Sequence, residues 1–269
     1  MYFVIKLNPY CCTADKNGFA GKDVFMLQCT DLNEALMLAS LNQKTETIGV
    51  LAEKTLHSVL KYYFCSDNSL HEVKFKGYVA DILEERNGNV PLIVEIQTKQ
   101  AFRLAKKLAS YADDAEIIIV LPVICEKTIA LRSAVTGEIV STRKSPKHPN
   151  IYHALKEAYG IREYINNRNI TLCIPFIKAV EYKNTENISE KDIVPEEITD
   201  IVYLKSAQDY MKLIPFKSDV DFTVDEFAKS AKISVKDARY ALLALHTAGV
   251  TEQCGKNGRK KLWRLKPVR

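Results

Sequence analysis

Residues 77–99 contain two short segments of alternating polarity joined by a tight turn. Residues 77–83 alternate enough to form a half-buried strand, and Asn87-Gly88-Asn89 has the composition of a turn between strands. Residues 91–97 form the second segment, with apolar and other side chains alternating between its two sides. The pattern predicts a pair of β-strands, which any fold of this chain must include in a sheet.

Each of the two predicted strands carries an acidic side chain. Glu95 and Gln97 are two residues apart, so they project from the same face of the second strand. The opposite face carries Leu92, Val94 and Ile96. An antiparallel pairing would bring Asp81, on the first strand, close to Glu95. Two such carboxylates repel and each is costly to bury alone, and a divalent cation that prefers oxygen resolves both problems. Asp81 and Glu95 are therefore candidate ligands of Mg²⁺ or Mn²⁺.

The segments around this strand pair alternate between helical and strand periodicity. Residues 47–64 have apolar side chains at helical spacing, and residues 101–112 predict a second helix. Residues 116–121 form an apolar run typical of a fully buried strand. The resulting order is helix, strand, strand, helix, strand. A further strand at residues 72–76 is an alternative. This order predicts an α/β fold.

An Asp on one strand and Glu-x-Lys on the next, inside an αβββαβ core, is the signature of the PD-(D/E)xK nuclease superfamily, which this region resembles. The resemblance implies a restriction-endonuclease-like fold in which Asp81 and Glu95 bind the metal and Glu53 adds an acid from the preceding helix. The segments EKTLHSVLK, VEIQT and RKSPK also resemble an uncharacterised bacterial family that joins such a domain to a C-terminal winged helix. That similarity runs from about residue 48 to the end of the chain.

The chain departs from the superfamily pattern at Gln97, where a lysine usually stands. A lysine would supply positive charge beside the attacking water and the transition state, and Gln97 would only position the water by hydrogen bonding. Lys99 would share the face of Glu95 if the strand continued, and Lys144 or Lys147 from the following basic loop could reach in. The predicted catalytic set is Glu53, Asp81, Glu95, Gln97 and Lys99. His57 is expected to be a partner of Glu53 or a packing residue.

Residues 218–269 predict two helices followed by a basic hairpin. Thr223 and Glu226 match a capping box at the start of the first helix, and Ser234 can cap the second. Residues 255–259, Gly-Lys-Asn-Gly-Arg, have the composition of a hairpin tip. Helix, turn, helix and basic hairpin together resemble a winged helix-turn-helix domain.

The charge of this segment favours a polyanionic partner. Residues 218–269 carry eleven Lys and Arg against six Asp and Glu, which equals the whole formal excess of +5. The second helix would enter the major groove and the hairpin would contact phosphates. The expected DNA contacts are Arg143, Lys144, Lys147, Lys236, Arg239, Lys256, Arg259, Lys260 and Lys261. A solvated basic tail and a protein-docking module are the alternatives.

The sequence thus predicts four segments. Residues 1–45 are an extension of unknown role, 46–182 a PD-(D/E)xK nuclease-like domain, 183–217 an acidic connecting region and 218–269 a DNA-binding winged helix. The expected function is metal-dependent endonucleolytic DNA hydrolysis, with a catalytically inactive DNA-binding or regulatory protein as the alternative.

The sequence also bears on location and partners. No window reaches the roughly 18 apolar residues of a membrane span, and the N-terminus lacks the basic start of a signal peptide. We therefore expect a cytoplasmic protein without a membrane partner. DNA or RNA preference and oligomeric state, a homodimer included, stay open.

Overall fold

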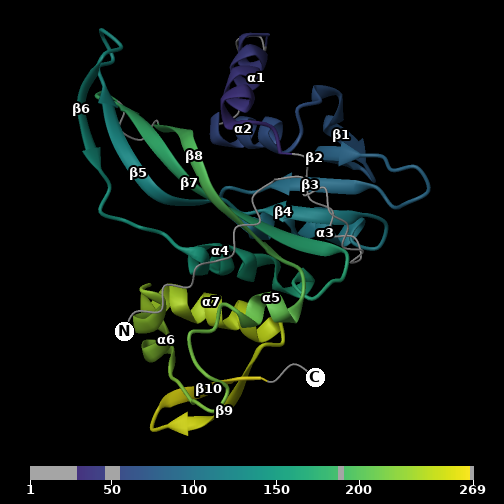
Figure 1. The fold of residues 1–269 in the computed structure, drawn as a ribbon, viewed down its shortest axis with the longest axis vertical. Helices are drawn as coiled ribbons and strands as arrows, with labels where there is room; N and C mark the ends of the chain where they lie inside the picture. Colours follow the sequence, from purple (N-terminus) through teal and green to yellow (C-terminus); the bar gives the residue numbers. More distant parts are fainter. Residues whose placement is uncertain (1–28, 46–54, 187–190, 267–269) are drawn as a thin grey trace, which may run out of the picture.

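The computed structural model describes residues 29–45, 55–186 and 191–266. They form a mixed α/β fold around one eight-stranded sheet, with a separate two-stranded hairpin near the C-terminus (Figure 1). The strands of the large sheet are β1 (His71–Phe75), β2 (Tyr78–Glu84), β3 (Leu92–Ile96), β4 (Glu116–Val120), β5 (Val123–Arg132), β6 (Ile139–Lys144), β7 (Ile170–Asn184) and β8 (Lys191–Leu204). The α/β class expected from the sequence is confirmed.

The predicted strand pair is β2 and β3. The two strands are antiparallel, with Ile82 opposite Val94 and Leu83 opposite Ile93. β3 is parallel to β4 and every residue of β3 is buried, because strands lie on both of its edges and helices on both of its faces. The complete order is β1-β2-β3-β4-β7-β5-β6, and β8 pairs with the remaining edge of β7.

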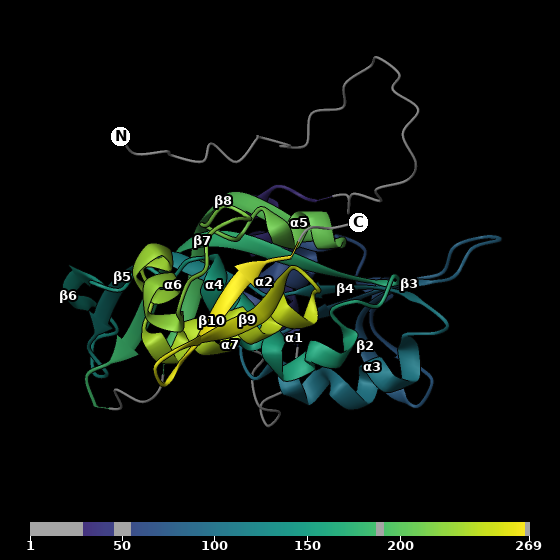
Figure 2. The same ribbon diagram turned by 90° about the horizontal axis from the view of Figure 1, so that it is seen from below.

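Helices cover both faces of the part of the sheet that contains β3, and in the view from below in Figure 2 the C-terminal helices and hairpin lie in front of the sheet. On one face α2 (Thr55–Phe64) packs Leu60 against the side of β3 that carries Val94, and α1 (Leu32–Thr45) packs on α2. On the other face lies α3 (Ala105–Tyr111), preceded by the 3₁₀ helix η2 (Ala101–Leu104). Another 3₁₀ helix, η1 (Asn68–Leu70), precedes β1. None of the described helices combines the length and apolar composition that a membrane span requires.

Residues 183–217, expected to be a connecting region, contain a long strand of the sheet, β8. β8 runs antiparallel to nearly the whole of β7, from Leu172 opposite Leu204 to Lys183 opposite Lys191. Ile193 and Ile198 pack on the core that contains α2, and the acidic side chains lie between such positions. The acidic segment therefore lies in an edge strand, where Glu196 and Glu197 are exposed. A short helix, α5 (Ala207–Met211), follows.

The C-terminal segment contains the expected succession of elements. α6 (Val224–Ala231) begins at a Thr223–Glu226 capping box, and α7 (Val235–Thr247) begins at Ser234. The hairpin of β9 (Thr251–Asn257) and β10 (Lys260–Leu265) comes last. Trp263 of β10 also forms a bridge with Phe222.

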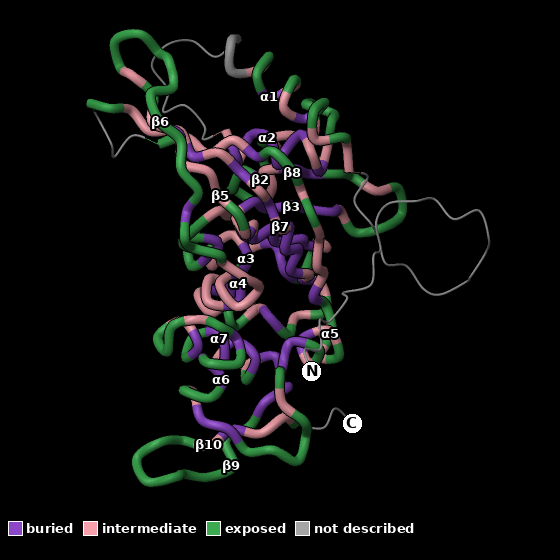
Figure 3. Tube along the Cα trace, turned by 60° about the vertical axis from the view of Figure 1, so that its left-hand side comes forward, coloured by how far each residue is buried: buried purple, intermediate pink, exposed green. Residues whose placement is uncertain are grey.

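This segment is not packed as an independent unit. α7 lies against α4 (Ile151–Ala158) and the 3₁₀ helix η3 (Tyr159–Tyr164). One hydrophobic cluster runs from the sheet through α4 to α7 and β10, whereas β6 and the hairpin tip are exposed (Figure 3). The sheet and the C-terminal helices therefore share a core.

Candidate metal-binding and nucleic-acid-binding sites

The Asp81 carboxylate lies where β2 and β3 stop pairing, one residue beyond the Ile82–Val94 pair. Because no strand hydrogen bond is made here, the backbone N–H of Ile96 is available, and it donates to Asp81 Oδ2 at 2.7 Å. His57 Nε2 lies 3.3 Å from the same oxygen. Asp81 is therefore held by β3 on one side and by α2 on the other.

The position of His57 follows from the attachment of α2 to two strands. Thr55 Oγ1 donates to Asp192 Oδ2 of β8 at 2.6 Å, and Lys61 Nζ lies 2.8 Å from Glu72 Oε1 of β1. The apolar stripe of α2 faces the sheet between these anchors. His57 is thus a partner of Asp81, and its expected partner Glu53 lies outside the described residues.

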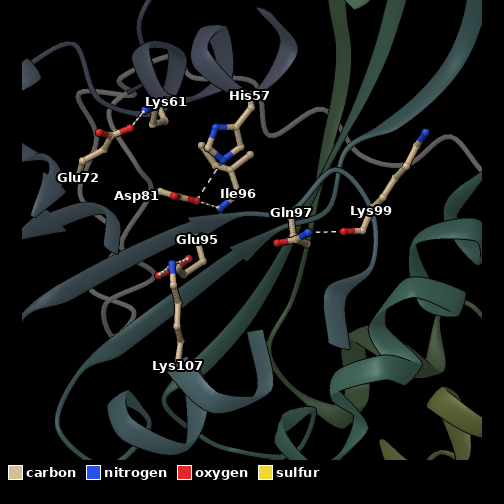
Figure 4. Close-up of polar contacts among 9 residues, drawn as sticks. All are labelled: His57, Lys61, Glu72, Asp81, Glu95, Ile96, Gln97, Lys99 and Lys107. Carbon is tan, nitrogen blue, oxygen red and sulfur yellow. Dashed lines mark hydrogen bonds and ion pairs between the residues drawn. The ribbon is translucent and has the colours of Figure 1, made fainter. Parts of the chain in front are cut away.

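The Glu95 carboxylate is paired with a lysine from α3. Lys107 Nζ lies 2.8 Å from Glu95 Oε2 and 3.1 Å from Oε1, so one ammonium group contacts both oxygens. The Glu95 side chain is only 1% exposed, and an unpaired charge there would be very costly. In Figure 4 Glu95 points toward Lys107, whereas Asp81 points toward His57 and Ile96.

The two carboxylates have opposite pKa shifts. Burial, and after it the negative charge of Asp81, raises the pKa of Glu95 to about 7, against the opposing charge and hydrogen bond of Lys107. Burial alone would also raise the pKa of Asp81, but the hydrogen bond and charge of His57, with the Ile96 N–H and Lys107, lower it below its usual value. Environments that separate two acids in this way are typical of sites that bind metals or transfer protons.

Tyr111 adds a polar group near the acids. Its side chain is fully buried at the end of α3, and among the described residues its hydroxyl has no hydrogen-bond partner. Burial, followed by the charges of Glu95 and Asp81, raises the pKa of Tyr111 to about 12. The hydroxyl therefore stays neutral and keeps its proton beside the acidic pair.

The expected common face of Glu95, Gln97 and Lys99 does not form. β3 ends at Ile96, and the chain turns so that Gln100 takes a left-handed conformation with φ of 58°. The Gln97 side-chain amide donates to the backbone oxygen of Lys99 (Figure 4). The ammonium of Lys99 points away from Glu95 in the same view. The Gln97 amide is thus bonded within its own turn, and the Lys99 ammonium is directed away from Glu95.

The predicted DNA contacts at the end of β6 also lie far from the acids. Arg143 pairs with Ile129 of β5, which lies opposite Glu181 of β7. Glu95 is paired with Ile119 of β4, which lies opposite Leu172 of β7. Nine residues of strand separate these two levels of β7, which corresponds to about 30 Å. Arg143 and Lys144 are exposed at this level of the sheet, so β6 directs neither of them to the acids, and Lys147 is exposed in the loop that follows β6.

Lys107 is the site residue that the sequence interpretation missed. It lies three residues after Leu104 and four before Tyr111, so it shares one side of the helix with these two buried residues. A lysine on such a stripe needs a buried acid, and this spacing is the signal that indicates it. Which acid it meets depends on the packing of α3 over β3.

The C-terminal basic residues gather between α7 and the β9–β10 hairpin. Arg239 of α7 and Arg259, Lys260 and Lys261 of the hairpin line one pocket. Lys236 is exposed on the same helix, and Lys256 is exposed opposite Lys261 in the hairpin. The other side of α7 is occupied, because Asp237 pairs with Lys156 of α4 at 2.8 Å and Tyr240 contacts the ring of Tyr159.

Among the described residues, no group of three or more His, Cys, Asp and Glu side chains is arranged to hold a metal ion. Mg²⁺ does not require such a group, because one or two carboxylates with water and substrate phosphate can complete its coordination. Asp81, which is half-buried, and Glu95, which is buried, supply two such carboxylates from adjacent strands. The Lys107 ammonium now compensates the charge of Glu95 that a cation would otherwise compensate.

A family model matches residues 54–209, which is more than half of the chain, and its description is "Domain of unknown function (DUF8091)". The chain belongs to this family. The matched region begins just before α2 and ends in α5, so the DUF8091 domain contains β8 as well as Asp81, Glu95 and Lys107. No curated protein and no solved structure matches the chain.

Proposed function

We propose that this protein is a metal-dependent DNA nuclease with a restriction-endonuclease-like DUF8091 domain and a DNA-binding winged helix. The observation that carries the proposal is a half-buried acid, Asp81, and a buried acid, Glu95, on adjacent strands, with Lys107 of α3 in contact with Glu95. The order α2-β1-β2-β3-α3-β4 supports it, because the superfamily core has the same succession.

In this proposal Asp81 and Glu95 hold Mg²⁺ or Mn²⁺. The metal would supply activation of water and compensation of charge on the phosphoryl oxygens. His57 orients Asp81 and keeps it ionised, because its hydrogen bond and charge favour the carboxylate. Lys107 supplies the positive charge that Gln97 lacks, and Tyr111, whose pKa the charges of both acids raise, keeps a neutral hydroxyl donor.

The C-terminal segment supports DNA binding. α6, α7 and the β9–β10 hairpin follow one another as in a winged helix, and the exposed cations lie on the α7 face turned away from α4 and on the hairpin. Phosphate contacts would dominate this binding, so the affinity would fall steeply with salt concentration.

The direct test compares the wild type with Glu95→Gln on supercoiled plasmid and single-stranded DNA, with Mg²⁺ or Mn²⁺. We expect the wild type to cleave and the variant to lose about a hundredfold or more in rate while binding DNA equally well. Glu85→Gln, a change at an exposed acid between β2 and β3, serves as the matched control. Equal cleavage by wild type and Glu95→Gln would refute the hydrolytic role.

The second candidate is a DNA-binding regulator that has kept the nuclease scaffold without its activity. The contact of Lys107 with both oxygens of Glu95 favours it, because that ion pair already satisfies the acid without a metal. Salt-sensitive DNA binding with no cleavage under any metal condition is the result expected of this candidate.

A further inference from the structure

A pocket of about 420 Å³ lies between α6, α7 and the β9–β10 hairpin, at the end of the molecule farthest from α1 (Figure 1). Its volume is in the range of sites that enclose small ligands. Part of its wall is apolar and comes from α7, namely Val235, Leu242 and Leu243. Val235 is 39% exposed, although it is an apolar residue in the first turn of the helix.

The remaining wall is strongly cationic. Lys260 is paired with Asp225 of α6 at 2.7 Å, and this contact ties the hairpin to α6 across the pocket. Arg239, Arg259 and Lys261 also line the pocket, and none of them forms an ion pair with any residue that the structure describes. Three uncompensated cations therefore surround a partly apolar hollow.

The combination indicates the chemistry of the occupant. Contacts to duplex phosphates require exposed cations, but they gain nothing from an apolar hollow, because a phosphate has no apolar surface to bury. A small organic anion uses both walls, with its charged group at the arginines and its apolar body against the α7 side chains. We propose that this pocket binds a small organic anion with an apolar body.

Such a ligand would compete with DNA, a consequence that rests on the proposed function. Arg239, Arg259, Lys260 and Lys261 are all expected DNA contacts, and a ligand that neutralises them removes part of the attraction to phosphates. The DNA-binding surface would then respond to a small molecule that fits between α7 and the hairpin.

Trp263 provides a local reporter for the test. It is the single tryptophan of the chain, it lines the pocket and it is 3% exposed. The probe is 8-anilinonaphthalene-1-sulfonate, which carries one sulfonate on an apolar aromatic body and accepts energy from excited tryptophan. With the full-length protein we expect saturable quenching of Trp263 emission at one probe per chain, reversed by duplex DNA.

Two charge reversals on α7 localise the site. Arg239→Glu places an acid in the pocket wall and should weaken probe binding about tenfold or more, equivalent to about 1.4 kcal/mol. Lys236→Glu makes the same charge change on the same helix outside the pocket and should change the affinity by less than about twofold. Val235→Asp is a second variant that places an acid in the pocket wall. The fold should tolerate it because an acidic side chain is favourable in the first turn of a helix.

The outcomes separate this proposal from the nuclease proposal. Absence of saturable quenching, or equal weakening by Arg239→Glu and Lys236→Glu, would overturn the pocket and leave only a basic surface. If Arg239→Glu lost DNA binding while the wild type bound no probe, the cations of the pocket would serve nucleic acid alone. That result would also overturn the pocket proposal. Glu95→Gln should bind the probe as the wild type does, so a failure of the cleavage test would not affect this result.

Discussion

At the scale of single residues, Glu95 should make the stability of the protein depend on pH. Burial raises its pKa from 4.5 to about 7, so the folded state binds this proton more tightly than the unfolded state. The stabilisation from this proton is complete below about pH 4.5 and is lost as the pH rises through about 7. The free energy of unfolding should fall by about 3 kcal/mol over this range. Urea unfolding of the wild type and Glu95→Gln at about pH 4.5 and about pH 8 measures it. The difference between the two proteins should change by that amount, and a constant difference would contradict the prediction.

Lys107 should be the functional replacement for the missing lysine at position 97. Lys107→Met removes the cation from Glu95, and we expect cleavage to fall by about a hundredfold. The double variant Lys107→Met with Gln97→Lys should recover part of this loss, because the new ammonium restores positive charge next to the acids. Lys106→Met is the control, since Lys106 is exposed. Equal losses from Lys106→Met and Lys107→Met would exclude a specific role for Lys107.

At the scale of elements, the start of α4 connects the sheet domain to the C-terminal helices. Asn150 Oδ1 caps α4 by accepting from Tyr152 N at 3.2 Å, and its Nδ2 donates to Ala231 O of α6 at 2.8 Å. Asn150→Ala should destabilise the protein by about 2 kcal/mol, the sum of a lost cap and a lost hydrogen bond between elements. Thr223→Ala, which removes only a cap, should cost about 1 kcal/mol. Urea unfolding measures both, and equal values would show that the contact with Ala231 contributes nothing.

At the scale of the whole molecule, the shared core predicts a single cooperative unfolding transition. One hydrophobic cluster contains Ile93 of the sheet, Leu155 of α4 and Leu245 of α7. The C-terminal helices therefore cannot separate without exposing apolar side chains of this shared core to water. Trp263 fluorescence reports the C-terminal segment, and far-UV circular dichroism reports the whole chain. We expect the two urea transitions to coincide and Asn150→Ala to shift both together. An earlier fluorescence transition would show that residues 218–269 unfold on their own.

The sequence by itself determined the features that depend on short stretches of chain. The alternation around Asn87-Gly88-Asn89 correctly predicted β2 and β3, and Thr223 and Ser234 correctly marked the starts of α6 and α7. Side-chain periodicity and helix caps arise from interactions within a few residues, so the local sequence suffices to predict them.

Only the tertiary structure decided which distant groups meet. Lys107 reaches Glu95 because α3 folds over β3, and His57 reaches Asp81 because β1 and β8 hold α2 against the other face. The same packing makes an edge strand of the acidic segment that contains Lys191–Leu204, and it leaves Arg143 far along β7 from the acids. These outcomes depend on strand order, strand register and the placement of helices on the sheet. All three are set by burial of apolar surface over the whole chain, which no local pattern records.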